Sequence, residues 1–243
     1  MGDIATDAGL HHLAHRPGLP RLIAVDGSAA SGKSTVGQRL AARLGYPFLD
    51  TGTMYRAITV AAVKRGIPAT DAPALSRLAS LVDMQVGLAE PGSGETATIS
   101  VDGEDVTAEL RRPDVEEAVS LVSRVAGVRD ALVALQRRIA ASRPIVMAGR
   151  DIGTVVLPDA DLKVYLDASL NERAARRHRE FGTLGREVTQ AAVLQDLRRR
   201  DQIDKKRTAS PLRPAPDAVI IETDSLTLDE VMSRVMRLVE EQA

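Results

Sequence analysis

A glycine-rich motif near the start of the chain constrains its fold more than any other feature. Gly27, Gly32, Lys33 and Ser34 follow the pattern Gly-x-x-x-x-Gly-Lys-Ser, after a short apolar run and before apolar residues at helical spacing. A strand, a glycine-rich turn and a helix in this order hold the phosphates of a nucleotide on backbone N–H groups and the helix N-terminus. The motif therefore predicts an α/β protein that binds ATP or GTP.

Each part of this cradle has an expected role. Lys33 would neutralise the β- and γ-phosphate oxygens, and the hydroxyl of Ser34 would join the coordination shell of a magnesium ion that accompanies the nucleotide. The predicted ATP-binding residues are Gly27, Ser28, Ala29, Ala30, Ser31, Gly32, Lys33, Ser34 and Thr35.

Short apolar runs alternate with helical patterns along most of the chain. Buried strands are expected at 22–25, 47–49, 145–148, 162–166 and 218–221. This alternation predicts a doubly wound parallel sheet. The stretch 84–112 differs, because its apolar residues alternate and Asp102-Gly103 is typical of a two-residue hairpin turn, so we expect a small β insert there. Ser169 and Thr227 open two helices with predicted capping boxes.

The composition bears on the partners and the cellular location that we expect. A net charge of -1 provides no field that would attract nucleic acid or an anionic membrane. The basic runs at 198–200 and 205–207 are interleaved with aspartates, which favours a mixed-charge helix over a nucleic-acid patch. The absence of cysteine excludes disulfides and thiol catalysis. With no signal-peptide pattern and no long apolar run, we expect a cytoplasmic monomer without nucleic-acid or membrane partners.

Two further polar loops each follow a predicted strand. Thr51 and Arg56 belong to the first loop, and Arg150 and Asp151 belong to the second. Because the carboxyl ends of parallel strands share one sheet edge, both loops should face the nucleotide crevice. The two arginines could hold a second phosphate, and the carboxylate of Asp151 could accept from an amine such as cytosine N4. The alternative for the first loop is a helix cap with a surface arginine.

With these motifs in view, the chain resembles the bacterial cytidylate kinases. The resemblance rests on the cradle and on the stretches LDTGTMYR, GRDIGTVVLPDADLKVYLDAS and RRRDQIDKKRTASPLRPAPDAV. It implies a P-loop core at 21–83 and 129–243, an insert that binds the nucleoside monophosphate at 84–128 and a mobile helical lid at 170–190. Residues 1–20 lie outside the resemblance, and because they lack periodicity we expect a flexible tail there. The resemblance also implies transfer of a phosphoryl group from ATP to CMP or dCMP with Mg²⁺.

The resemblance assigns roles to matching residues. It implies that Thr51, Arg56 and Arg150 contact the CMP phosphate, that Ser120, Arg129 and Asp151 recognise cytosine, that Arg200 and Asp204 hold the ribose, and that Arg111 and Arg207 are further nucleotide-site arginines. Arg112 is an equal candidate for the role of Arg111. In the cradle, residues 28–31 depart from the usual version with Pro and Gly, and we expect little loss because the backbone holds the phosphate.

Three arginines could complete the catalytic charge. Arg173, Arg176 and Arg177 fall at i, i+3 and i+4 and so share one helix face. As part of a lid they could close over the phosphates and exclude water. We therefore predict Lys33, Arg150, Arg173 and Arg177 as catalytic residues. The alternative is a solvated helix face.

Three other classes of nucleotide-binding protein are alternatives: a GTPase, another small-molecule kinase, and a protein that binds nucleotide without transferring phosphate. A GTPase needs Asn or Thr followed by Lys-x-Asp, but the only asparagine, Asn171, precedes Glu172 and no Thr-Lys pair occurs. Shikimate kinase and adenylate kinase share parts of the pattern without combining the two acceptor loops. A protein that binds nucleotide without transferring phosphate would lack the acceptor arginines.

Overall fold

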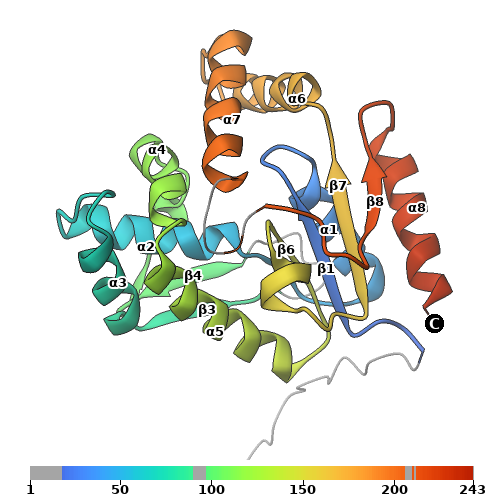
Figure 1. Cartoon of the computed structure of the whole chain (residues 1–243), viewed down its shortest axis with the longest axis horizontal. Coiled ribbons are helices and arrows are strands. Elements are labelled where there is room, and N and C mark those ends of the chain that lie inside the picture. Colours follow the sequence, from blue (N-terminus) through green and yellow to red (C-terminus); the bar gives the residue numbers. More distant parts are fainter. Residues whose placement is uncertain (1–17, 90–96, 206–209, 211, 243) are drawn as a thin grey trace, which may run out of the picture.

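Five parallel strands form the central sheet of the computed structural model, which describes residues 18–89, 97–205, 210 and 212–242. The strand order is β2-β6-β1-β7-β8 (Figure 1). The strands are β1 (Leu22–Gly27), β2 (Phe48–Asp50), β6 (Ile145–Gly149), β7 (Leu162–Asp167) and β8 (Val219–Glu222). The predicted parallel sheet is confirmed, and β1 lies at its centre between β6 and β7.

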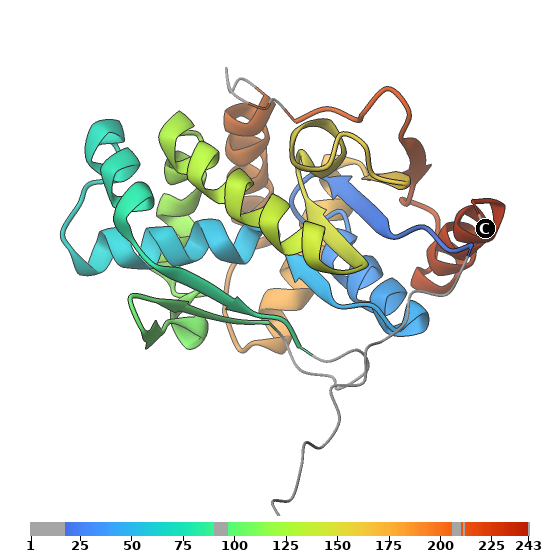
Figure 2. The same ribbon diagram turned by 90° about the horizontal axis from the view of Figure 1, so that it is seen from below.

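Helices cover both faces of this sheet. Ile23 and Val25 pack in a cluster with α1 (Lys33–Leu44) and α8 (Leu228–Glu241), whereas Ala24 belongs to the cluster on the opposite face. Alternate side chains of one strand point to opposite faces, so a strand that is apolar throughout must be covered twice. Figure 2 shows the helices of residues 72–142 on one side of the molecule and α8 on the other. The sheet is therefore doubly wound, as predicted.

A second, antiparallel sheet forms the predicted β insert. Its strands are β3 (Met84–Gly87), β4 (Thr98–Val101) and β5 (Glu104–Asp105). The turn between the last two strands has positive φ at both central residues, 51° at Asp102 and 82° at Gly103. Positive φ at both positions is what a type I′ hairpin turn requires, so the predicted turn is confirmed.

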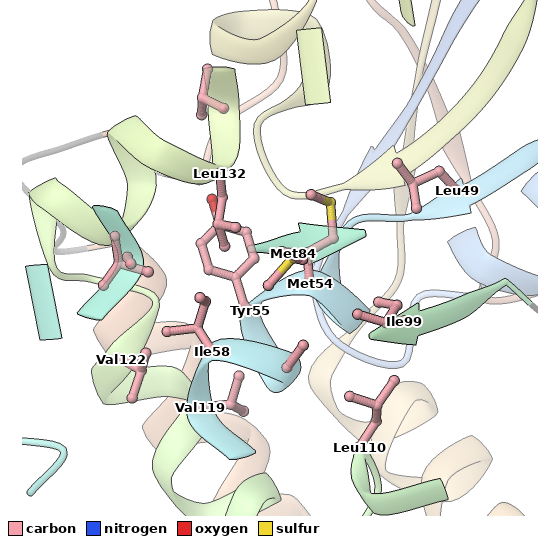
Figure 3. Close-up of a cluster of buried hydrophobic side chains, with 14 of the residues drawn as sticks. Leu49, Met54, Tyr55, Ile58, Met84, Ile99, Leu110, Val119, Val122 and Leu132 are labelled. Atoms are coloured by element: carbon pink, nitrogen blue, oxygen red, sulfur yellow. The ribbon is translucent and has the colours of Figure 1, made fainter. Parts of the chain in front are cut away.

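Four helices lie on the same side of the molecule as the insert, and the first of them packs against β4: α2 (Gly52–Lys64), α3 (Ala72–Leu81), α4 (Pro113–Val122) and α5 (Ala126–Ser142). One buried cluster joins them to the sheet. Figure 3 shows Met54 and Tyr55 of α2 beside Leu132 of α5 and Ile99 of the insert. The β insert and the central parallel sheet therefore share one hydrophobic cluster.

Two helices, α6 (Leu170–Thr183) and α7 (Gln190–Lys205), stand beyond the carboxyl end of β7 (Figure 1). Ser169 caps α6 by accepting from the N–H of Glu172, and Thr227 begins α8 with a complete capping box. The predicted box is thus complete only at the second helix. A turn of π-helix at Ile152–Val156 follows β6.

Some predictions fall outside this description. Residues 1–17 of the predicted tail, residues 90–96 of the insert and Arg207 lie outside the described residues. Leu19, which the tail prediction includes, packs against the core. Within the described ranges, no helix combines the length and apolarity that a membrane span needs.

Candidate active site

The cradle is a backbone structure that only glycine permits at two positions. A Cβ on Gly27 would lie 2.5 Å from the carbonyl oxygen of Leu166 and 2.6 Å from the hydroxyl of Ser31. Gly32 has a left-handed conformation, with φ of 93°, immediately before α1. Side chains at these positions would clash or strain the turn. The motif therefore folds as predicted, with the N-terminus of α1 at its end.

Lys33 is held inside the cradle. Its Nζ donates to the carbonyl oxygen of Ser28 at 3.0 Å. Burial, followed by the positive charge of Arg150, lowers the pKa of Lys33 from 10.5 to about 8. Both effects disfavour an unneutralised ammonium group. Lys33 thus lies where an anion would be favoured.

Asp50, which the sequence reasoning did not select, lies beside the cradle. The hydroxyl of Ser34 donates to one of its carboxylate oxygens at 2.6 Å, and the N–H of Gly52 donates to the other at 3.0 Å. A hydroxyl and a carboxylate are hard oxygen donors of the kind that Mg²⁺ prefers. The chemistry of this pair therefore fits the metal that the resemblance implies. Asp50 stands inside the LDTGTMYR stretch, which was the signal for it.

One cavity of about 1110 Å³ connects the cradle to the insert. Most of the predicted site residues line it. They are Ala29, Ala30, Gly32, Lys33, Ser34, Thr35, Thr51, Arg56, Arg111, Arg129, Arg150, Asp151, Arg177 and Arg200. Gly27, Ser28, Ser31, Ser120, Arg173 and Asp204 lie outside this lining.

The acceptor side of the cavity carries concentrated positive charge. Burial lowers the pKa of Arg56, and the negative charge of Asp50 partly offsets this effect. Burial also lowers the pKa of Arg200. Arg150 forms an ion pair with Asp204, with Nε and Oδ2 2.5 Å apart. Three guanidinium groups close together are stabilised by an incoming anion. The hydroxyl of Thr51, which was also predicted to contact the phosphate, donates instead to the carbonyl oxygen of Ala148 at 3.0 Å.

The predicted base-recognition residues meet in the interior. Arg129 and Asp151 form a buried ion pair, and the guanidinium of Arg129 lies 5.5 Å from the centre of the Tyr55 ring. Arg129 also donates to the carbonyl oxygen of Ser123 at 3.3 Å. Ser123 lines the cavity, whereas Ser120, which was predicted, is buried one turn away on α4. The prediction of Ser120 came from the resemblance, which did not point to Ser123.

The three arginines of α6 that were predicted to face the phosphates have separate partners. Arg173 forms a bidentate pair with Asp201 of α7, at 2.6 and 3.1 Å, and does not line the main cavity. Arg176 and Arg177 do line it. The shared helix face is therefore real, but the guanidinium of Arg173 fastens α6 to α7.

Glu116 of α4 is a contact that sequence reasoning missed. Its two carboxylate oxygens accept from Arg177 at 2.9 Å and from Arg186 at 3.0 Å, and its backbone oxygen accepts from Arg200 at 2.8 Å. Burial would raise the pKa of Glu116, but Arg186 and Arg177 bring it below its ordinary value. The carboxylate of Glu116 thus connects α4 to α6 and to the segment that follows α6, and its backbone oxygen connects α4 to α7.

A phosphate cradle that opens on an arginine-rich acceptor pocket, within a doubly wound parallel sheet, defines a P-loop phosphotransferase. Residues 23–241 match the model of the cytidylate kinase family, and the chain belongs to that family. It is therefore an enzyme, a nucleoside monophosphate kinase.

Curated relatives agree with this assignment. The cytidylate kinase of Nocardia farcinica is 49% identical over 224 residues, which cover 92% of this chain and 95% of the relative. The cytidylate kinase of Pelotomaculum thermopropionicum is 46% identical over 214 residues, with 88% and 93% covered. A gluconokinase structure from Sinorhizobium meliloti 1021 covers 92% of this chain and 95% of its own, at 19% identity and a TM-score of 0.44, which is too low to add to the assignment.

Proposed function

We propose that this enzyme transfers the γ-phosphoryl group of ATP to CMP and dCMP with Mg²⁺. The observation that carries this proposal is the single cavity, in which the cradle around Lys33 and the acceptor arginines Arg56 and Arg150 face the same space. Two anions held side by side in one cavity are the arrangement that phosphoryl transfer needs.

The reaction requires positioning more than acid–base chemistry. A phosphate monoester is largely ionised near neutral pH, so its oxygen can attack the γ-phosphorus in line without a general base. Lys33 holds the β- and γ-phosphate oxygens, while Arg56 and Arg150 orient the attacking phosphate. The Ser34 hydroxyl, with Asp50 beside it, would hold a Mg²⁺ ion, which when bound would neutralise further phosphate charge.

Recognition of the base rests on Asp151. Its carboxylate can accept a hydrogen bond from the exocyclic amine of cytosine, whereas uracil presents a carbonyl oxygen that the carboxylate repels. The buried guanidinium of Arg129 pairs with the carboxylate of Asp151 and holds it in place. Ser123 reaches the same cavity from α4, so we add it to Ser120 as a candidate contact.

The remaining roles follow from position. We propose that Arg111, Arg177 and Arg200 contact the nucleotides, that Asp204 orients Arg150 as well as the ribose, and that Arg173 acts by holding α6 against α7. We also propose residues 170–190 as the lid and 84–128 as the insert that binds the monophosphate. A cytoplasmic monomer without nucleic-acid partners stays a prediction.

Product analysis tests the proposal. The protein is incubated with ATP, CMP and Mg²⁺, and the nucleotides are separated by ion-exchange chromatography. CDP and ADP should form in equal amounts, and chelation of the metal should stop the reaction until Mg²⁺ is restored. Lys33→Ala should abolish transfer, whereas Lys64→Ala, a matched change in a lysine outside the cavity, should not. Absence of CDP with the unaltered protein would refute the proposal.

A further inference from the structure

Asp26 connects the cradle to the acceptor loop. It is the last residue before Gly27, and its side chain is 4% exposed. Its two carboxylate oxygens accept from the backbone N–H groups of Ile152 and Gly153, each at 2.7 Å. These donors directly follow Asp151 in the chain. One side chain therefore bridges segments that lie 126 residues apart in the sequence.

The fit around this carboxylate is close. A Cβ on Gly153 would lie 3.3 Å from Oδ2 of Asp26 and 3.1 Å from Cδ of Lys163, so a larger residue there would have to displace both side chains by a few tenths of an ångström. On the neighbouring strand, Gly149 is the register partner of Asp26. The acceptor loop thus leaves β6 beside Asp26 and is held by its carboxylate a few residues later.

The charge of Asp26 does not stabilise the fold. Burial raises its pKa from 3.8 to about 6, although the two backbone N–H groups act in the opposite direction. A carboxyl group whose pKa is higher in the folded chain favours folding in its protonated form, so ionisation at neutral pH opposes folding. The ionised carboxylate of Asp26 instead serves to accept the two hydrogen bonds from the loop.

We propose that Asp26 is a positioning residue, which fixes the acceptor loop of Arg150 and Asp151 relative to the cradle through its two hydrogen bonds. This inference rests on the proposed function. The cradle itself is anchored by α1, so loss of these hydrogen bonds should displace the acceptor side and leave the ATP side in place. Asp26 would therefore set the distance between the attacking oxygen and the γ-phosphorus.

Asp26→Asn is the direct test. The amide nitrogen of asparagine would oppose one of the two backbone N–H groups, so at least one hydrogen bond is lost without a change of size. We expect kcat with CMP to fall on the order of 10- to 100-fold and the KM for CMP to rise, since a small displacement of reacting groups has effects of this size. The dissociation constant of a non-hydrolysable ATP analogue, measured by calorimetry without CMP, should change less than about twofold.

Asp161→Asn, just before β7, is a control at the opposite end of β1. One oxygen of Asp161 accepts from the backbone N–H groups of Arg21 and Leu22, both at 2.8 Å, at the end of β1 away from the cavity. The variant makes the same change of carboxylate to amide, and because one oxygen accepts both N–H groups the amide oxygen of asparagine can keep both hydrogen bonds, so kcat and the KM for CMP should stay unchanged. Gly153→Ala approaches the same contact from the loop side and should reproduce the effect of Asp26→Asn.

The kinetic and binding measurements distinguish a positioning role of Asp26 from a general structural role. A selective loss of CMP turnover in Asp26→Asn and Gly153→Ala, with the affinity for the ATP analogue retained, supports the inference. Wild-type kinetics with CMP in both variants would overturn it. A parallel loss of affinity for CMP and the ATP analogue would also overturn it, because that pattern indicates a general structural role. If the unaltered protein makes no CDP, the proposed function fails first and this inference fails with it.

Discussion

Replacing Lys33 by methionine should stabilise the nucleotide-free protein while abolishing phosphoryl transfer. The site holds Lys33 charged for a ligand, at a cost to the empty protein. Lowering its pKa from 10.5 to about 8 corresponds to roughly 3 kcal/mol at neutral pH. Partial exposure of the side chain and loss of the hydrogen bond to Ser28 reduce the expected gain to about 2 kcal/mol.

The sign of this effect depends on pH. Below about pH 8 Lys33 is protonated in both the folded and the unfolded chain, so the full cost is present. Between pH 8 and 10.5 the unfolded chain binds a proton that the folded chain does not, and the wild type gains stability as pH rises. The advantage of Lys33→Met should therefore shrink over this window.

Thermal unfolding without nucleotide measures this prediction. At pH 7, a gain of about 2 kcal/mol should raise Tm by roughly 4–8 °C in a chain of this size. Lys64→Met is the control, because Glu104 and Glu109 raise the pKa of Lys64 and its replacement should not stabilise the protein. A Lys33→Met variant that is less stable than the wild type at pH 7, or equally more stable at pH 7 and pH 10, would refute the reasoning.

Two further predictions concern single contacts of the site. Asp151→Ala should reduce the preference for CMP over UMP, measured as the ratio of kcat/KM values, and should destabilise the protein by about 3 kcal/mol because Arg129 is left buried and unpaired. Adding Arg129→Met should recover stability in denaturant titrations without recovering the preference; if the preference is unaffected in both, Asp151 does not recognise the base. Arg173→Ala should lower Tm with a modest effect on kcat, because its guanidinium is paired with Asp201, whereas Arg177→Ala should lower kcat more than Tm. The reverse ranking would show that Arg173 contacts the phosphates.

The features that the sequence predicts well are those encoded locally. The cradle depends on glycines at two fixed positions, and the hairpin depends on Asp102-Gly103, so each can be recognised without knowledge of distant residues. The helix α3 was not predicted, although its signals are present. Asp71 caps it by accepting from the N–H of Ala74, and a proline stands in its first turn.

The partners of charged side chains could not be predicted in the same way. Spacing places Arg173 and Arg177 on one helix face, but tertiary packing brings Asp201 to the first and Glu116 to the second. The contact between Asp26 and the loop at Ile152 likewise arises because β1 and β6 are neighbours in the sheet. Sequence patterns identify which groups can bind phosphate, whereas packing decides which of them face the cavity.

The central claim is that the cavity holds a cytidine monophosphate beside ATP. Initial rates of ADP release, measured in a coupled assay with CMP, dCMP, UMP, AMP and shikimate as acceptors, test it most directly. We predict that CMP and dCMP give the highest rates, that UMP is a poor acceptor, and that AMP and shikimate stay near the rate of ATP hydrolysis without acceptor. A higher rate with shikimate or AMP than with CMP would contradict the account.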